Sequence, residues 1–214
     1  MEIQPDTSIP ESDDFLCQFQ GFWFAPSFLL GTQKLLKQFK PLPNDVILAS
    51  FPKTGTTWLK SILYSILNRS SIDELTRNHP QLLVPQLELQ VYGPDAISDP
   101  LFPSLDPSSP NRIFSTHLPY QIFRETVNSS DCRVVYIARN PKDTLVSGWH
   151  FLNTMETAKS SPLPIDESVD MFCEGKGKVG DHKNYLTKDM IDRVDTITRE
   201  KFHGSIFKHE ADSS

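Results

Sequence analysis

Short continuous apolar runs alternate along this chain with longer segments whose apolar residues recur every three or four positions. The runs are typical of parallel strands buried on both faces, and the recurring spacing is typical of amphipathic helices. The predicted strands lie at 46–49, 112–117 and 133–138. The predicted helices lie at 31–39, 56–68, 141–155 and 188–202. Strands and helices that alternate in this order indicate an α/β fold with a mainly parallel sheet flanked by helices.

Capping residues place several helix ends. Asn140 and Pro141 suit the N-cap and the first position of one helix, and Thr187 suits the N-cap of the last. Ser71 and Glu74 have the spacing of a capping box, which predicts a further short helix.

The stretch from Pro80 to Pro119 holds eight of the 17 prolines, so it is predicted to be mostly extended loop. No strand-like run follows Ala138. Three strands make a thin sheet for 214 residues, which indicates either a further strand that the pattern misses or an incomplete sheet with missing sequence.

The N-terminal segment divides into two parts. Residues 1–14 are polar and acidic, which predicts a disordered arm, and 15–214 are expected to form a single domain. Aromatic residues then gather at Phe15, Phe19, Phe22, Trp23, Phe24 and Phe28. Such a cluster is more often core, and the alternative is the wall of a substrate pocket.

Charge and composition narrow the possible partners. The net charge is −6 and the isoelectric point is near 5.5, which argues against general affinity for nucleic acid or anionic membranes. The three cysteines lack the spacing of a disulfide framework or a zinc site. No apolar run reaches the roughly 18 residues of a membrane span. A reducing, cytoplasmic location is therefore expected.

The loop FPKTGTTW follows the first predicted strand and opens a helix, so its backbone N–H groups and the helix dipole favour a phosphate. Lys53 adds a positive charge, Gly55 allows close backbone approach, and three hydroxyls supply donors. The hydroxyls belong to Thr54, Thr56 and Thr57. The spacing differs from the Walker A pattern, and the alternative is an ordinary turn with a surface lysine. A buried strand, a phosphate-favouring loop and a helix in this order predict a P-loop-like sheet.

A second segment, RNPKDTLVSGWHF, carries candidate phosphate ligands at the end of another strand. Arg139 lies where ligands bind in parallel sheets, and Ser147 lies two helical turns beyond Asn140, on the same helix face. Both could bind one further phosphate. The alternatives are a structural ion pair for Arg139 and simple packing for Ser147.

The segments FPKTGTTWLKSIL, FSTHLPY and ARNPKDTLVSGWHF occur here in the order and approximate spacing of one family. The chain resembles plant-type cytosolic sulfotransferases from about Phe19 to Glu174. The resemblance implies transfer of a sulfuryl group from 3′-phosphoadenosine 5′-phosphosulfate to a hydroxyl of a small molecule, without a metal. Such loose, in-line transfer depends on positioning and electrostatic stabilisation.

The resemblance also implies roles for individual residues. Lys53 would neutralise the leaving 5′-phosphate oxygen, and His117 would take the acceptor proton. Without the family, His117 is one of six histidines and could be an inert strand-end residue. The residues implied to contact the phosphosulfate and adenine are Thr56, Thr57 and Trp58, and those implied to hold the 3′-phosphate are Arg139 and Ser147.

The C-terminal part departs from the family. The stretch GKGKVGDHK resembles its last cofactor motif, with Lys176 and Gly177 as candidate phosphate ligands, although a solvated loop is the alternative. A long segment normally precedes that motif, so we infer an internal deletion near 175. The rival hypotheses are a truncated, non-catalytic nucleotide binder and a nucleotide kinase or triphosphatase. The missing Walker A glycines and strand-end Asp disfavour the second.

Overall fold

A three-stranded parallel sheet forms the centre of the computed structural model, which describes residues 16–94, 109, 111–154, 162–174 and 186–202. The strands are β3 (Val46–Ser50), β4 (Ile113–Thr116) and β5 (Arg133–Ile137), in the order β4-β3-β5. Val46 aligns with Ile113 on one side and with Arg133 on the other. The predicted parallel α/β fold is confirmed, with each strand within a residue or two of its expected place.

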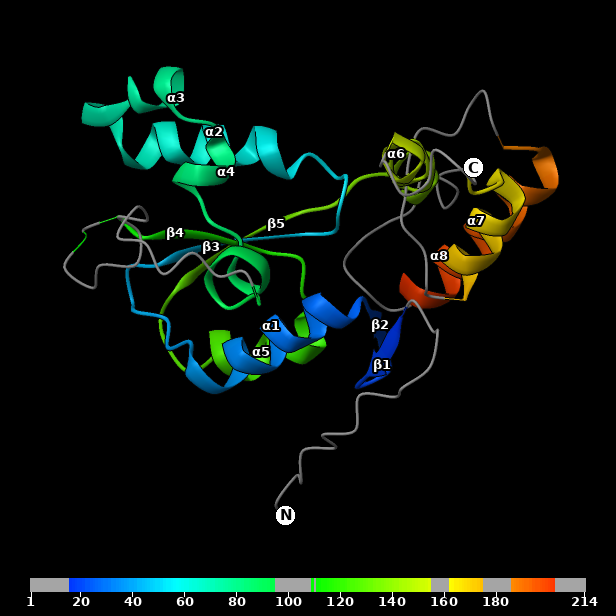
Figure 1. Cartoon of the computed structure of the whole chain (residues 1–214), viewed down its shortest axis with the longest axis horizontal. Helices are drawn as coiled ribbons and strands as arrows, with labels where there is room; N and C mark the ends of the chain where they lie inside the picture. Colours follow the sequence, from blue (N-terminus) through cyan, green and yellow to red (C-terminus); the bar gives the residue numbers. More distant parts are fainter. Residues whose placement is uncertain (1–15, 95–108, 110, 155–161, 175–185, 203–214) are drawn as a thin grey trace, which may run out of the picture.

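Helices cover both faces of the sheet (Figure 1). One face carries α2, α3 and α4, and the opposite face carries α1 and α5. Their bounds are α1 (Pro26–Gln38), α2 (Thr56–Leu67), α3 (Glu74–Arg77), α4 (Pro80–Leu83) and α5 (Tyr120–Val127). Alternate side chains of a strand point to opposite faces. Ile47 therefore packs in the cluster under α1 and α5, and Val46 packs in the cluster under α2.

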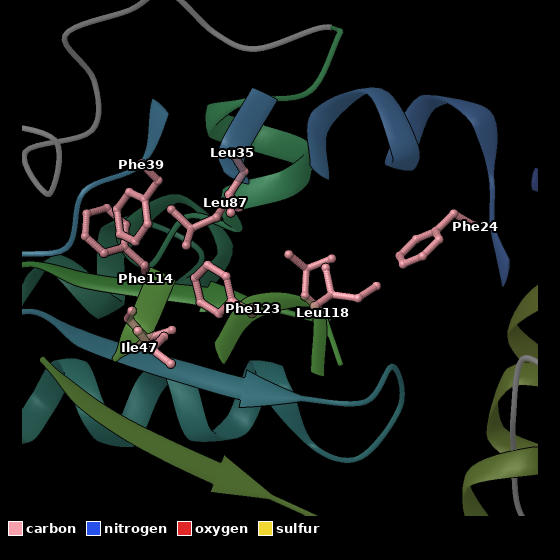
Figure 2. Packing of buried hydrophobic residues seen from close by; sticks show 10 residues of the cluster. Phe24, Leu35, Phe39, Ile47, Leu87, Phe114, Leu118 and Phe123 are labelled. Carbon is pink, nitrogen blue, oxygen red and sulfur yellow. The ribbon is translucent and has the colours of Figure 1, made fainter. Parts of the chain in front are cut away.

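The larger core lies on the α1 and α5 face. Figure 2 shows Phe39, Leu87 and Phe123 gathered around Phe114 and Ile47. The ring centroids of Phe39 and Phe114 are 5.4 Å apart in an edge-to-face arrangement, a geometry that aromatic pairs favour.

A third group of helices lies beside the sheet (Figure 1). It comprises α6 (Pro141–Thr154), α7 (Ile165–Cys173) and α8 (Lys188–Phe202). Leu145, Val169 and Val194 are fully buried between them. The Lys142 ammonium lies 2.8 Å from Asp195, which joins α6 to α8. The predicted caps are present, since Asn140 accepts from the N–H of Lys142 and Thr187 accepts from that of Met190.

The aromatic N-terminal segment forms a two-stranded hairpin, β1 (Cys17–Phe19) and β2 (Phe22–Phe24). Gln20 and Gly21 have positive φ at its turn. Phe24 is buried and stacks on Phe28, while Phe19 and Phe22 pack against the same core cluster. The core interpretation is therefore confirmed for Phe24, and Phe19, Phe22 and Phe28 are partly buried against the same core.

Several predicted elements need correction. Helix α1 begins at Pro26 rather than 31, because proline suits the first helical turn. Ser71 lies inside a 3₁₀ turn (Arg69–Ser71), so the capping box is absent. The proline-rich stretch is helical in its first part, with α4 and a π-helical turn, η2 (Leu87–Val91). Helix α7 is not predicted at all.

Several predictions fall outside the described residues: the acidic arm, Phe15, Lys176, Gly177 and the junction near 175. Among the described residues, no helix is both long and apolar enough to cross a membrane. No described cluster of three His, Cys, Asp or Glu side chains has an arrangement that could hold a metal ion.

Candidate functional site

The turn between β3 and α2 has the backbone of an anion-binding loop. Lys53 and Gly55 both have positive φ, at 67° and 107°, which turns the chain sharply into the helix. Gly55 is the N-cap of α2. The first turn of this helix has no side-chain cap and no acidic residue. The first N–H groups of α2 therefore keep their capacity to bind an anion.

The ends of β3 and β5 meet at this loop. The Arg139 guanidinium, just after β5, donates to the carbonyl oxygen of Lys53 at 3.4 Å. The Lys53 ammonium lies 4.3 Å from the ring centroid of Phe151 on α6, a cation–π contact. The structure therefore brings Lys53 and Arg139 together, and adds Phe151, which the sequence analysis did not single out.

The three threonines of the loop differ in their contacts. The buried Thr54 hydroxyl donates to the carbonyl of Phe51 at 2.7 Å, which braces the turn. The buried Thr56 hydroxyl lies 2.8 Å from that of Ser50. Thr57 is exposed and its hydroxyl accepts from the Gln81 amide at 3.2 Å, so its own proton can still be donated outward.

Helix α2 buries a face turned partly away from the one its apolar spacing predicts. The spacing predicts an inward stripe of Trp58, Leu59, Ile62, Leu63, Ile66 and Leu67. Trp58 is 69% exposed and Ile66 is exposed, whereas Thr56, Lys60 and Leu63 point inward. Trp58 therefore presents a large aromatic surface beside the loop. The Ser147 side chain on α6 is half-buried, and no hydrogen bond among the described residues joins it to the loop.

His117 follows β4 at the same edge of the sheet, since the carboxyl ends of parallel strands lie together. Its Nδ1 donates to the carbonyl oxygen of Ser50 at 2.6 Å and lies 3.3 Å from the Ser50 hydroxyl. A carbonyl can only accept, so Nδ1 carries the proton. Nε2 is then the basic nitrogen, the state that a general base needs.

Burial lowers the pKa of the His117 imidazole, because desolvation disfavours its charged form. Glu88 and the Ser50 carbonyl act in the opposite direction, and Lys60 lowers the pKa further. The ring is therefore neutral at the start of a reaction near neutral pH.

The sequence analysis did not identify two buried charged residues near His117. Lys60 on α2 and Glu88 on η2 are both fully buried. Desolvation lowers the pKa of Lys60 to about 8, although Glu88 partly offsets this. The apolar spacing of the helix gave no signal for Lys60, because this residue lies outside the predicted inward stripe.

Comparison with known proteins now identifies the family. Residues 43–177 match the model of the sulfotransferase domain. The chain is 39% identical over 183 residues to cytosolic sulfotransferase 5 of Arabidopsis thaliana, covering 79% of this chain and 54% of that protein. It is 37% identical over 212 residues to cytosolic sulfotransferase 12 of the same plant, covering 91% and 63%. The chain spans about half the length of curated relatives that it matches.

Solved structures show the same fold. A crystal structure of an Arabidopsis thaliana protein, described as a candidate steroid sulphotransferase, is 28% identical and superposes with a TM-score of 0.73, covering 91% of this chain and 89% of that one. A mouse sulfotransferase complexed with PAP is 23% identical with a TM-score of 0.51, covering 94% and 73%. From its matched domain, its relatives and its fold, the chain belongs to the sulfotransferase family.

Proposed function

We propose that this chain binds 3′-phosphoadenosine 5′-phosphosulfate and transfers its sulfuryl group to a hydroxyl of a small molecule. The observation that carries the proposal is the meeting of three strand ends. Arg139 after β5 contacts the backbone of Lys53 after β3, and His117 after β4 bonds to Ser50 on β3. A cytosolic location is part of the proposal, since the most similar relatives carry that name.

The described residues fit a nucleotide with two phosphate positions. The N–H groups at the start of α2, Lys53 and the Thr57 hydroxyl would bind the 5′-phosphosulfate. Arg139 would bind the 3′-phosphate, because its planar fork can donate two hydrogen bonds to one phosphate. Ser147, Lys176 and Gly177 complete the proposed phosphate ligands, and the exposed Trp58 ring would pack on the adenine.

The proposed transfer breaks the bond between sulfur and the bridging oxygen of the 5′-phosphate, and forms a bond between sulfur and the acceptor oxygen. His117 Nε2 accepts the acceptor proton, and Lys53 neutralises the charge that develops on the leaving phosphate oxygen. Lys53 already lies at the loop, where its ammonium rests on Phe151. These charges supply the electrostatic stabilisation that a metal supplies in many phosphoryl transferases.

A second candidate function is nucleotide binding without turnover. It is favoured by the match of the chain to only about half the length of its relatives, and by the exposure of Val134 and Tyr136 on β5. A shortened sheet could keep the phosphate loop and lose part of the acceptor pocket. The inferred deletion near 175 belongs to this proposal.

Two measurements on the purified chain test these proposals. Calorimetric titration with adenosine 3′,5′-bisphosphate, with and without EDTA, measures binding, and transfer of radiolabelled sulfate from the donor to a panel of phenolic and aliphatic alcohols measures turnover. Metal-independent binding with turnover supports the sulfotransferase, and binding without turnover supports the second function. Binding that requires Mg²⁺ would contradict both. Arg139→Met, which replaces the proposed ligand of the 3′-phosphate, should weaken this binding. The matched control Arg124→Met, on the exposed face of α5, should leave it unchanged.

A further inference from the structure

A buried polar network lies next to the loop and His117. Its charged members are Glu88 on η2 and Lys60 on α2, and both are fully buried. Burial of a charge is costly unless it is compensated, so such a pair in a small core demands a reason.

The Glu88 side chain contacts the backbone of His117. Gln86 forms an isolated parallel bridge with Ser115 on β4, and the chain then enters η2, which carries Glu88. The Glu88 carboxylate oxygen Oε1 accepts from the backbone N–H of His117 at 2.6 Å and from the Gln86 amide at 2.8 Å. This carboxylate is therefore attached to the residue that carries the proposed base.

Packing holds Glu88 in this place. Helix α1 approaches η2 so closely that a Cβ on Gly31 would lie 1.8 Å from the carbonyl oxygen of Glu88. The second carboxylate oxygen, Oε2, is buried and has no hydrogen-bond partner among the described residues. Its negative charge is only partly compensated by hydrogen bonds, and it acts on nearby groups through a medium of low dielectric constant.

Lys60 connects the same network to the anion-binding helix. Its ammonium donates to the side-chain oxygen of Gln81 on α4, and the Gln81 amide donates to the Thr57 hydroxyl. Glu88 and Lys60 attract each other, and both act on the His117 ring. Among the described residues, they are the charged side chains that do so, and the Ser50 carbonyl is the hydrogen-bond acceptor of the ring.

We propose that Glu88 and Lys60 are positioning residues that set the proton affinity of His117 with opposite sign. The Glu88 carboxylate fixes the backbone of His117 and stabilises the imidazolium that forms when Nε2 accepts the acceptor proton. The Lys60 ammonium opposes that charge and keeps the ring neutral beforehand. The proposal rests on the proposed function, in which His117 is the base.

The test measures the His117 titration directly, by NMR of histidine-labelled chain from pH 5 to pH 8.5, with His117→Asn identifying its signal. Glu88→Gln keeps an acceptor for the His117 N–H and removes the charge, so the midpoint should fall by on the order of 0.5 to 1 pH unit. Lys60→Met should raise it by a smaller amount, and the midpoint of the double variant should lie between those of the two single variants. The matched surface controls Glu125→Gln and Lys34→Met should leave it unchanged.

A midpoint that stays constant or rises in Glu88→Gln would overturn the proposal. Loss of the cooperative unfolding transition in that variant would also overturn it, because the carboxylate would then serve the stability of the fold. The pH profile of turnover is the second readout, and its acidic limb should move with the NMR midpoint. A chain without turnover whose midpoints shift as expected would contradict the proposed function and leave the positioning pair intact.

Discussion

Strands β4 and β5 flank β3 symmetrically, and each ends at a candidate site residue, yet their surroundings differ. All four residues of β4 are buried, and its outer edge is covered where the N–H of Ser115 donates to Pro85. On β5, Val134 is 48% exposed and Tyr136 is 53% exposed, and no described segment pairs with its outer edge. His117 therefore follows a rigid, covered strand, and Arg139 follows an open one.

The two environments suit the roles proposed for the two residues. A base works best where burial and fixed neighbours tune its proton affinity, as they do for His117. A phosphate ligand must be reached from solvent, and Arg139 is exposed at the end of its strand. Four predictions test this contrast.

Replacement of the buried base should have the largest effect. His117→Asn removes the proton acceptor and should lower kcat by about 10²- to 10⁴-fold, the usual contribution of a general base. Affinity for adenosine 3′,5′-bisphosphate should be retained, because no phosphate contact is lost. Turnover assays and calorimetry on the same preparation check this, and a variant with normal kcat would exclude His117 as the base.

The covered strand should also dominate stability. Phe114→Ala empties a fully buried site against Phe39 and should lower the free energy of unfolding by about 3–5 kcal/mol. Val134→Ala on the open strand should cost below about 1 kcal/mol, because about half of that side chain is already in contact with solvent. Urea unfolding of both variants measures the difference. Equal costs would show that β5 is covered in solution.

Loss of the exposed arginine should weaken binding without affecting the fold. Arg139→Met should raise the Kd for adenosine 3′,5′-bisphosphate by about 10- to 100-fold, which is about 1.4–2.8 kcal/mol. Adenosine 5′-phosphate lacks the 3′-phosphate, so its affinity should change little. An equal loss with both ligands would indicate that Arg139 acts on the loop through the Lys53 carbonyl.

The smallest effect concerns the pH dependence of stability. The pKa of His117 is lower in the folded chain than its ordinary value of 6.5, so the unfolded chain binds the proton more readily. The contribution of His117 to stability is therefore present above about pH 6.5 and is lost as the pH falls towards the folded pKa. Urea unfolding from about pH 7.5 to about pH 5 should show a shallower pH dependence in His117→Asn than in the original chain.

Local patterns in the sequence were sufficient for the three central strands and for helices α2, α6 and α8. The apolar run 46–49 and the loop after it predicted the strand, the turn and the helix, because strand periodicity, glycine and helix start signals act over a few residues. Asn140 and Pro141 placed the start of α6 for the same reason. These features depend on neighbours along the chain.

Longer-range packing decided the rest. The apolar spacing of α2 predicted Trp58 and Ile66 on the inward face, whereas the structure buries Lys60 there and exposes both. The helix η2 also differs from the pattern, because tertiary contacts override local preference. A single sequence does not say which helix face will meet the sheet when a polar network competes with apolar residues.

By itself, the sequence determined the strand-loop-helix unit, the candidate phosphate ligands and the family to which they point. Only the tertiary structure decided that Arg139 contacts the Lys53 backbone, that Ser50 sets the tautomer of His117, and that Glu88 and Lys60 are buried near that ring. The physical reason is distance along the chain. Backbone and capping preferences act within a few residues, whereas burial and electrostatic coupling join residues 29 to 86 positions apart.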